Sequence, residues 1–134
     1  MFRYQRKVFL RDTDATGVIY FGSMLQYSLE AFETFLQDSE YSLPYLLSLG
    51  YLFPVVHAEA DYKAPIQVGD DLSFFLKVSK ISDRSFTIET EITRSFDEVV
   101  VGRTKMVHAF LFKGDAKSSV IPEKLVGLLR SIAK

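Results

Sequence analysis

Residues 21–37 read FGSMLQYSLEAFETFLQ, and their apolar positions recur every three or four residues along the stretch. This spacing is typical of an amphipathic helix, in which side chains three and four residues apart share one face. The expected apolar face consists of Leu25, Leu29, Phe32, Phe35 and Leu36, while the opposite side carries Glu30, Glu33 and Gln37. The sequence therefore predicts one long helix that packs this face against a second layer of structure.

After the helical region the hydrophobic period changes to two, which is the period of β-strands. We expect strands at residues 54–63, 72–82, 85–95 and 98–112, with turn residues between them. The alternation is clearest in residues 85–95, where one face carries Phe86, Ile88 and Ile92 and the other carries Thr87, Glu89, Glu91 and Thr93. Residues 98–112 are apolar on both faces over much of their length, so this strand is expected to be central in the sheet.

Weaker signals complete the order of elements. Residues 2–11 alternate imperfectly and predict a first strand, while Ser42 and Gly50 bracket a short helix. Pro122 is expected at the first position of a closing helix. Short turns favour antiparallel neighbours, so we predict an α+β fold in which the long helix lies across a curved antiparallel sheet. A chain of 134 residues is expected to form a single domain, residues 1–134.

The composition argues against several classes of function. Lys and Arg total 16 against 17 Asp and Glu, which is not the positive excess that non-specific nucleic-acid binding requires. There is no cysteine and there are two histidines, His57 and His108, so we expect no disulfide, no thiolate nucleophile and no metal site. No apolar run is long enough to span a bilayer or to form the core of a signal peptide, and the expected location is cytoplasmic.

Two carboxylates and a glycine precede the predicted helix in residues 12–20, DTDATGVIY. One interpretation is structural, because Asp12 and Asp14 could cap the helix and Gly17 could relieve a tight turn. The other is catalytic, because a helix N-terminus presents free backbone N–H groups that can hold a developing oxyanion beside a carboxylate. Spacing alone leaves both interpretations open.

The run Asp12-Thr13-Asp14-x-x-Gly17-Val18-Ile19-Tyr20-Phe21 resembles the signature of hotdog-fold acyl-CoA thioesterases of the 4-hydroxybenzoyl-CoA thioesterase and YbgC-like type. The resemblance continues toward the branch that contains 1,4-dihydroxy-2-naphthoyl-CoA thioesterases, through Pro54-Val55-Val56-His57-Ala58, Ala60-Asp61-Tyr62, Pro65 and Gly69-Asp70. It implies a hotdog fold, in which a curved antiparallel sheet of about five strands wraps around one long helix. It also implies a homodimer or homotetramer with active sites at the dimer interface.

The resemblance assigns roles to individual residues. Asp14 matches the catalytic carboxylate, acting as a nucleophile or as a general base for water, in a loop that includes Gly17 and Tyr20. The backbone N–H of Phe21 or a close neighbour would polarise the thioester carbonyl. Substrate-binding roles fall on His57, in the acyl pocket, and on Arg84 and Ser85, at the CoA phosphates. Two alternatives stay open, a hydrogen-bonded structural role for His57 and a solvated turn charge for Arg84. No cofactor is implied, because coenzyme A is part of the substrate.

Phe21 stands where YbgC-like members commonly have a histidine, and an apolar residue there fits an aromatic acyl pocket better. We therefore expect an aromatic substrate such as 1,4-dihydroxy-2-naphthoyl-CoA or 4-hydroxybenzoyl-CoA. A short-chain aliphatic acyl-CoA thioesterase of YbgC type and a non-catalytic acyl-CoA-binding hotdog protein stay open as alternatives. A hotdog dehydratase is disfavoured, because no histidine follows Asp14 before His57. Asp12 is expected to support the loop, and His108 to be structural.

Overall fold

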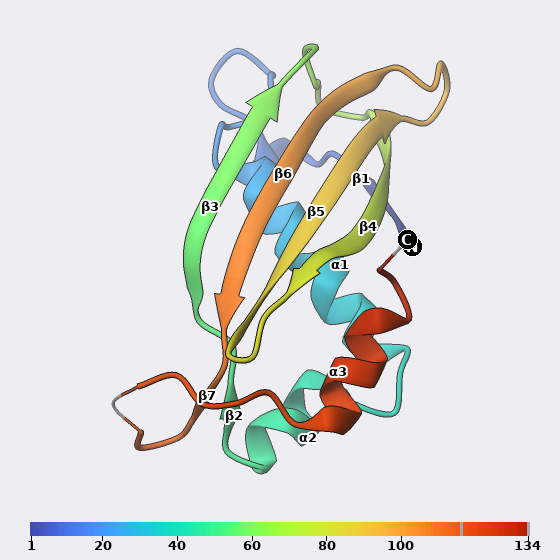
Figure 1. Cartoon of the computed structure of the whole chain (residues 1–134). Coiled ribbons are helices and arrows are strands. Elements are labelled where there is room, and N and C mark those ends of the chain that lie inside the picture. The colour runs from blue at the N-terminus through green and yellow to red at the C-terminus, as the bar shows by residue number, and fades with distance from the viewer. Residues whose placement is uncertain (116, 134) are drawn as a thin grey trace.

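The alternating segments of the sequence build a five-stranded sheet, seen in a computed structural model that describes residues 1–115 and 117–133. The strands lie in the order β1-β4-β5-β6-β3, and each runs antiparallel to its neighbours (Figure 1). Their bounds are β1 Phe2–Lys7, β3 Val55–Tyr62, β4 Asp71–Ile81, β5 Ser85–Arg94 and β6 Val100–Ala109. The predicted α+β class is confirmed.

The middle of the sheet is occupied by β5, the strand with the most regular alternation. Its residues Phe86, Ile88 and Ile92 are buried, as their shared parity predicts. The expectation that the last long strand is central is only partly met, because β6 lies between β5 and β3. One face of β6 carries Arg103 and Lys105, which are exposed, and this polar face agrees with a place one strand from the edge.

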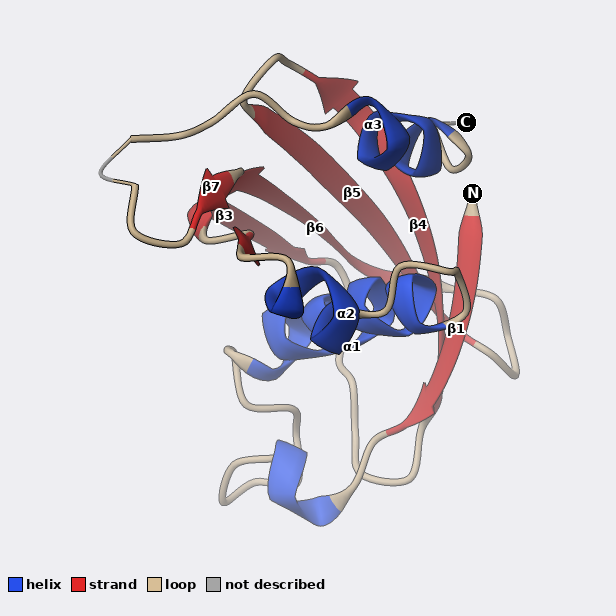
Figure 2. Cartoon of the chain, turned by 90° about the horizontal axis from the view of Figure 1, so that it is seen from below, coloured by secondary structure: helices blue, strands red, loops and turns tan. Residues whose placement is uncertain are grey.

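Helix α1 (Ser23–Gln37) lies inside the curve of the sheet, as the view from below shows (Figure 2). Its residues Met24, Tyr27 and Phe35 are buried in the core. The ring of Tyr27 meets the ring of Phe74 on β4 edge to face, with centroids 5.8 Å apart. The core therefore lies between α1 and the inner face of the sheet.

The helix differs from the prediction in its start and in its buried face. It begins at Ser23, and Leu29 is 40% exposed, whereas Ser28 and Ala31 are buried. The Ser28 hydroxyl lies 2.6 Å from Thr104 Oγ1, so this face of the helix is turned toward β6. The two elements also approach closely at Gly102, where an added Cβ would stand 2.3 Å from Met24 Cε. Small residues such as Ser28 and Ala31 carry little hydrophobic signal, so the sequence pattern does not show that they are buried.

Short elements flank the sheet and correct some predictions. Helix α2 (Leu43–Ser48) begins after Ser42 as expected. Helix α3 (Glu123–Arg130) begins one residue later than expected, with Pro122 at its N-cap and not at its first position. The first strand is shorter than predicted, because the chain turns into the 3-10 helix η1 (Leu10–Asp12). The last predicted strand divides, since β7 (Leu111–Phe112) leaves the main sheet and pairs with β2 (Tyr51–Leu52). No helix in the described ranges is long and apolar enough to cross a membrane.

Candidate active site

The chain forms a tight hairpin in front of α1, with Asp14 at its turn. The Asp14 N–H donates to Val18 O at 2.9 Å, and the Gly17 N–H donates to Asp14 O at 3.2 Å. Thr13 and Ile19 pair across the two arms as an antiparallel bridge. Gly17 has a φ of 81°, a left-handed conformation that glycine adopts at no steric cost. The motif glycine therefore sets the shape of the turn that presents Asp14.

The Asp14 side chain is exposed and is held by Thr16 on the same turn. Its Oδ1 accepts the Thr16 hydroxyl at 2.5 Å and the Thr16 N–H at 2.8 Å. These two bonds, the hydroxyl first, lower the pKa of the Asp14 carboxyl below its ordinary value. Oδ2 has no partner among the described residues. Asp14 is thus an ionised carboxylate with one oxygen held and the other open to a ligand.

The interpretation that the motif aspartates cap α1 is wrong. The N-cap residue is Gly22, which makes no side-chain cap bond. Asp12 is buried instead, where its Oδ2 accepts the Phe9 N–H at 3.0 Å and pairs with Arg6 at 2.6 Å. Burial acts to raise the pKa of Asp12, but the bonds from Phe9 and Arg6 outweigh it and lower that pKa overall. The supporting role expected of Asp12 agrees with these contacts.

Just before α1, the backbone N–H groups of Phe21 and Gly22 have no acceptor in the described part of the chain. The carbonyl oxygens of the same two peptides are engaged: Ser23 N–H donates to Tyr20 O at 2.9 Å, and the Tyr62 hydroxyl donates to Phe21 O. In a trans peptide the N–H points away from the C=O, so each held carbonyl also fixes the direction of an N–H. These two N–H groups are the candidate oxyanion donors.

An apolar groove of about 470 Å³ lies against the hairpin. Its lining residues are Val18, Ile19, Phe21, Tyr62, Lys63, Ala64, Pro65 and Ile66. The side chains of Phe21 and Tyr62 are 70% and 47% exposed, so two aromatic rings face an open space beside the hairpin. A groove of this size and lining is suited to a flat apolar group.

Four of the predicted site residues come together on the loop between β1 and α1: Asp14, Gly17, Tyr20 and Phe21. The rings of Tyr20 and Phe21 pack with centroids 4.5 Å apart. Tyr20 also lies over Gly22, where an added Cβ would stand 2.9 Å from the ring. The loop is therefore one packed unit that carries the carboxylate and both candidate donors.

Within one chain, the other three predicted residues lie away from this loop. His57 is on the outer face of the edge strand β3, opposite Val107, and its Nε2 lies 2.8 Å from Glu59 Oε1. Arg84 and Ser85 are at the turn between β4 and β5, at the opposite end of the sheet from the hairpin (Figure 1). The Arg84 guanidinium donates to Ser118 O at 2.5 Å. A single chain does not bring these residues to Asp14.

Two residues to which the sequence assigns no role contact the loop, Arg6 and Tyr62. Arg6 shares its strand face with Phe2 and Tyr4, and a charge among inward-facing apolar residues was the available signal. Tyr62 lies inside the downstream motif, but its partner Phe21 is 41 positions earlier in the chain. Contacts over such separations are not visible in residue spacing.

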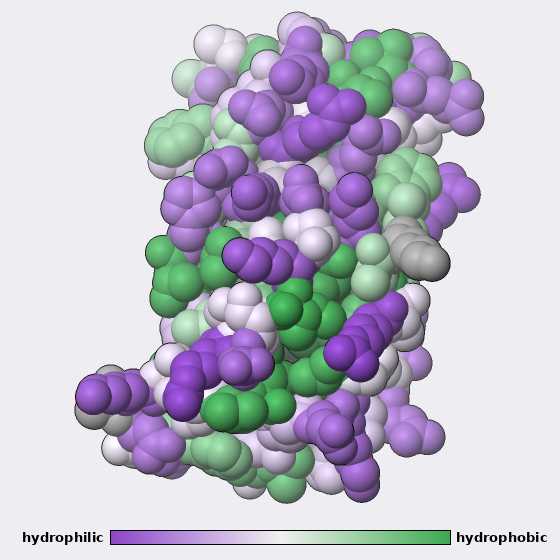
Figure 3. Space-filling model, viewed as in Figure 1, coloured by the Kyte–Doolittle hydropathy of each residue, from purple (hydrophilic) through white to green (hydrophobic). Residues whose placement is uncertain are grey.

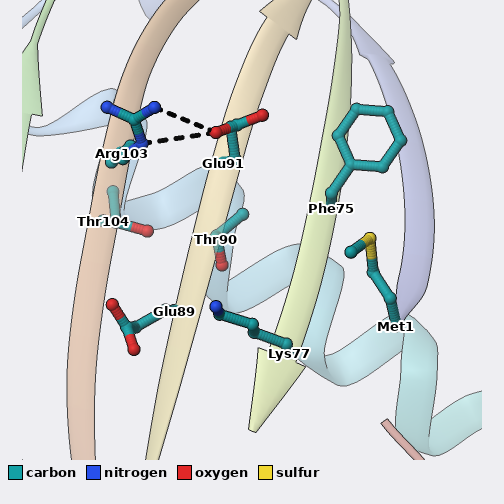
Figure 4. A pocket seen from close by; sticks show the side chains of 8 residues that line it. All are labelled: Met1, Phe75, Lys77, Glu89, Thr90, Glu91, Arg103 and Thr104. Carbon is teal, nitrogen blue, oxygen red and sulfur yellow. Dashed lines mark hydrogen bonds and ion pairs between the residues drawn. The ribbon is translucent and has the colours of Figure 1, made fainter. Parts of the chain in front are cut away.

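A second hollow, of about 390 Å³, lies on the outer face of the sheet, away from α1. Figure 4 shows the labelled residues Phe75, Lys77, Glu89, Glu91 and Arg103 on β4 to β6, with an ion pair of 3.1 Å between Arg103 and Glu91. The upper part of this face is largely hydrophilic (Figure 3). None of the loop residues lines this hollow. Nor do the described residues gather three or more side chains of metal-ligating type.

Comparison with known proteins agrees with this geometry. The Thioesterase-like superfamily matches residues 8–129. The 1,4-dihydroxy-2-naphthoyl-CoA hydrolase of Synechocystis is 33% identical over 123 residues, which are 91% of this chain and 89% of that protein. The enzyme of the same name from Nostoc punctiforme is 34% identical over 131 residues, 97% of this chain and 87% of that protein. The crystal structure of a 1,4-dihydroxy-2-naphthoyl-CoA thioesterase from Synechocystis matches with a TM-score of 0.91 at 30% identity, covering 99% of this chain and 98% of that one.

The sheet curved around α1 and the similarity to this solved thioesterase identify a thioester hydrolase of the hotdog fold. The chain belongs to the Thioesterase-like superfamily. The predicted family, fold and enzyme class are confirmed.

Proposed function

We propose that the chain hydrolyses an aromatic acyl-CoA to the free acid and coenzyme A, with 1,4-dihydroxy-2-naphthoyl-CoA as the first substrate to test and 4-hydroxybenzoyl-CoA as the second. One observation carries the proposal: the Asp14 hairpin leads directly to the N–H groups of Phe21 and Gly22, which have no acceptor in the described part of the chain, and its residues Val18 and Ile19 also line the apolar groove. The relatives from Synechocystis and Nostoc punctiforme, which are named as hydrolases of the first thioester, support this choice.

In the proposed reaction, the acyl ring occupies the groove and the thioester carbonyl accepts a bond from the N–H of Phe21 or Gly22. This bond stabilises the negative charge that develops on the carbonyl oxygen. Asp14 then either attacks the carbonyl carbon, giving an anhydride that water hydrolyses, or takes a proton from an attacking water. In both routes the carbon–sulfur bond breaks and coenzyme A leaves as a thiolate, which needs little help from an acid. The lowered pKa of Asp14 favours the ionised form that both routes use.

We further propose that two copies of the chain assemble through β3, which is an edge strand of the sheet. All of its residues except Ala60 are exposed, and an unpaired strand edge is a template for another strand. Antiparallel pairing of the two β3 strands would bring the start of one strand, with His57, alongside the end of the other, with Tyr62. The proposed roles of His57, Arg84 and Ser85 in substrate binding therefore depend on the second copy. Further pairing of dimers into a tetramer and a cytoplasmic location stay predictions.

The test is release of free coenzyme A from a panel of aromatic and straight-chain acyl-CoAs, with wild type and Asp14→Asn compared at equal folded concentration. We expect hydrolysis of the aromatic thioesters, and a loss of at least about a hundredfold in kcat for Asp14→Asn with substrate binding retained. Asp38→Asn is the matched control, because Asp38 is an exposed aspartate at the other end of α1. That variant should hydrolyse at the wild-type rate.

Other outcomes would change the proposal. Turnover restricted to aliphatic chains would keep the thioesterase and remove the aromatic acyl group. Binding of acyl-CoA without turnover by wild type would identify a carrier or sensor. Full activity in Asp14→Asn would move the catalytic carboxylate elsewhere.

A further inference from the structure

Arg6, on the inner face of β1, joins three parts of the molecule beside the active-site loop. Its side chain is 9% exposed. Nη1 donates to Asp12 Oδ2 at 2.6 Å, and Nε donates to Glu30 Oε2 on α1 at 2.7 Å. The guanidinium also lies over the ring of Tyr27, 4.3 Å from its centroid. One largely buried cation therefore connects the first strand, the loop and the helix.

Asp12 extends this connection to the reacting groups, because both its side chain and its main chain are engaged. Its carbonyl oxygen accepts the Tyr20 N–H at 2.8 Å and the Ser23 hydroxyl at 2.9 Å. Tyr20 and Ser23 flank the two N–H groups that are the candidate oxyanion donors, and Asp14 follows Asp12 by two residues. A displacement of Asp12 would thus move the carboxylate and the donors relative to each other.

We propose that Arg6 is a positioning residue, which holds Asp12 against α1 and so sets the distance between Asp14 and the oxyanion donors. This inference rests on the proposed function. Arginine suits the position because its planar guanidinium directs separate N–H groups at two carboxylates, whereas the ammonium group of lysine is a compact point charge. Without the guanidinium, the carboxylates of Asp12 and Glu30 would share the site without a fixed partner.

The effect belongs mainly to the chemical step, because Arg6 lines neither the groove nor the hairpin. A misplacement of about 1 Å between reacting groups lowers a rate by about a hundredfold. We expect Arg6→Lys to lower kcat by at least about tenfold per folded enzyme and to change KM by less than about twofold. Arg103→Lys is the matched control, because Arg103 pairs with Glu91 at 3.1 Å on the outer face of the sheet. Its kcat should equal that of wild type.

Hydrogen exchange over residues 12–23 supplies a readout that needs no turnover. Exchange should be faster in Arg6→Lys than in wild type, and unchanged in Arg103→Lys. If wild type hydrolyses no thioester, the proposed function fails. Faster exchange in Arg6→Lys would even then support the proposal that Arg6 holds the loop in place. Folded Arg6→Lys with wild-type kcat and wild-type exchange would overturn the proposal.

A second variant keeps the test decisive if Arg6→Lys does not fold. Glu30→Gln weakens one of the two ion pairs, and the Glu30 side chain is 41% exposed, so this variant should fold. We expect a smaller decrease in kcat than for Arg6→Lys, with KM again nearly constant. A wild-type kcat and wild-type loop exchange in folded Glu30→Gln would then overturn the proposal.

Discussion

His108 is a buried histidine on the inner face of β6, and its ring stacks on Phe86 with centroids 5.1 Å apart and an angle of 8° between the planes. Its Nδ1 lies 3.1 Å from Phe53 O, so Nδ1 carries the proton and donates it. Nε2 is buried without a partner among the described residues. Burial in this aromatic cluster lowers the pKa of His108 below its ordinary value, and only the neutral form fits.

This environment predicts that stability decreases in weak acid. The pKa of His108 is lower in the folded chain than the value of 6.5 of the unfolded one. As the pH falls below 6.5, the unfolded state binds a proton that the folded state excludes, and the free energy of unfolding falls by up to about 1.4 kcal/mol per pH unit. Urea unfolding between pH 8 and pH 5 measures this slope. We expect the slope to flatten in His108→Gln and to persist in His57→Gln, whose histidine is exposed. An equal slope in wild type and His108→Gln would refute the assignment.

Among the elements, the contact between α1 and β6 depends on Gly102. A Cβ at this position would stand 2.7 Å from Met24 Sδ and 2.8 Å from Asp61 O, and a backbone oxygen cannot move aside cheaply. We expect Gly102→Ala to destabilise the fold by about 1–3 kcal/mol through overpacking.

Gly127 provides the matched control for Gly102. It lies inside α3, and an added Cβ would meet nothing within 4 Å. Gly127→Ala should therefore stabilise the chain by about 0.5–1 kcal/mol, through its higher helix propensity. Thermal or urea unfolding of the two variants checks both signs. Equal stability of Gly102→Ala and wild type would mean that α1 can shift without loss.

How far the sequence predicts each element depends on whether its signal is local. The loop before α1 and the order of the main elements are encoded by neighbouring residues, and both agree with the structure; that this loop forms a hairpin is not predicted. The buried face of α1 is not encoded in this way, because Ser28 and Ala31 are buried although neither carries a strong hydrophobic signal. The sequence also does not predict to which face of the sheet His57 points. The register of β3 shifts between Val55 and His57, and this shift changes which residues point outward. The ion pair between Arg6 and Glu30 spans 24 positions and leaves no pattern in the sequence.

On the scale of the whole molecule, the exposed edge of β3 predicts a dimer. Val56 on this edge is 62% exposed, and a lysine on a strand edge opposes pairing with another strand. We expect Val56→Lys to raise the dissociation constant of the dimer by at least about tenfold, the equivalent of 1.4 kcal/mol. Activity should decrease in parallel at low protein concentration. Sedimentation velocity and dilution assays measure the two effects.

Val99→Lys is the control for this prediction. Val99 is also an exposed valine, at 40%, but it precedes β6 and is not on the β3 edge. This variant should dimerise as wild type does. A wild type that is monomeric and fully active at assay concentrations would contradict assembly through β3.

The Asp14 hairpin has a consequence for how such a protein can change over time. Ala15 and Thr16 at its tip are exposed, and Val68, which bonds to it through Gly17 O at 3.1 Å, is 47% exposed. The residues proposed to carry the chemistry are thus exposed and add little to the core, while stability depends on the residues packed under α1. Substitutions at the exposed positions of the tip and the groove, such as Ala15 and Phe21, should cost little stability, whereas the groove residues Ile19 and Ile66 are buried in the core. Natural selection or a designed library can therefore change the acyl specificity before the accumulated loss of stability unfolds the chain.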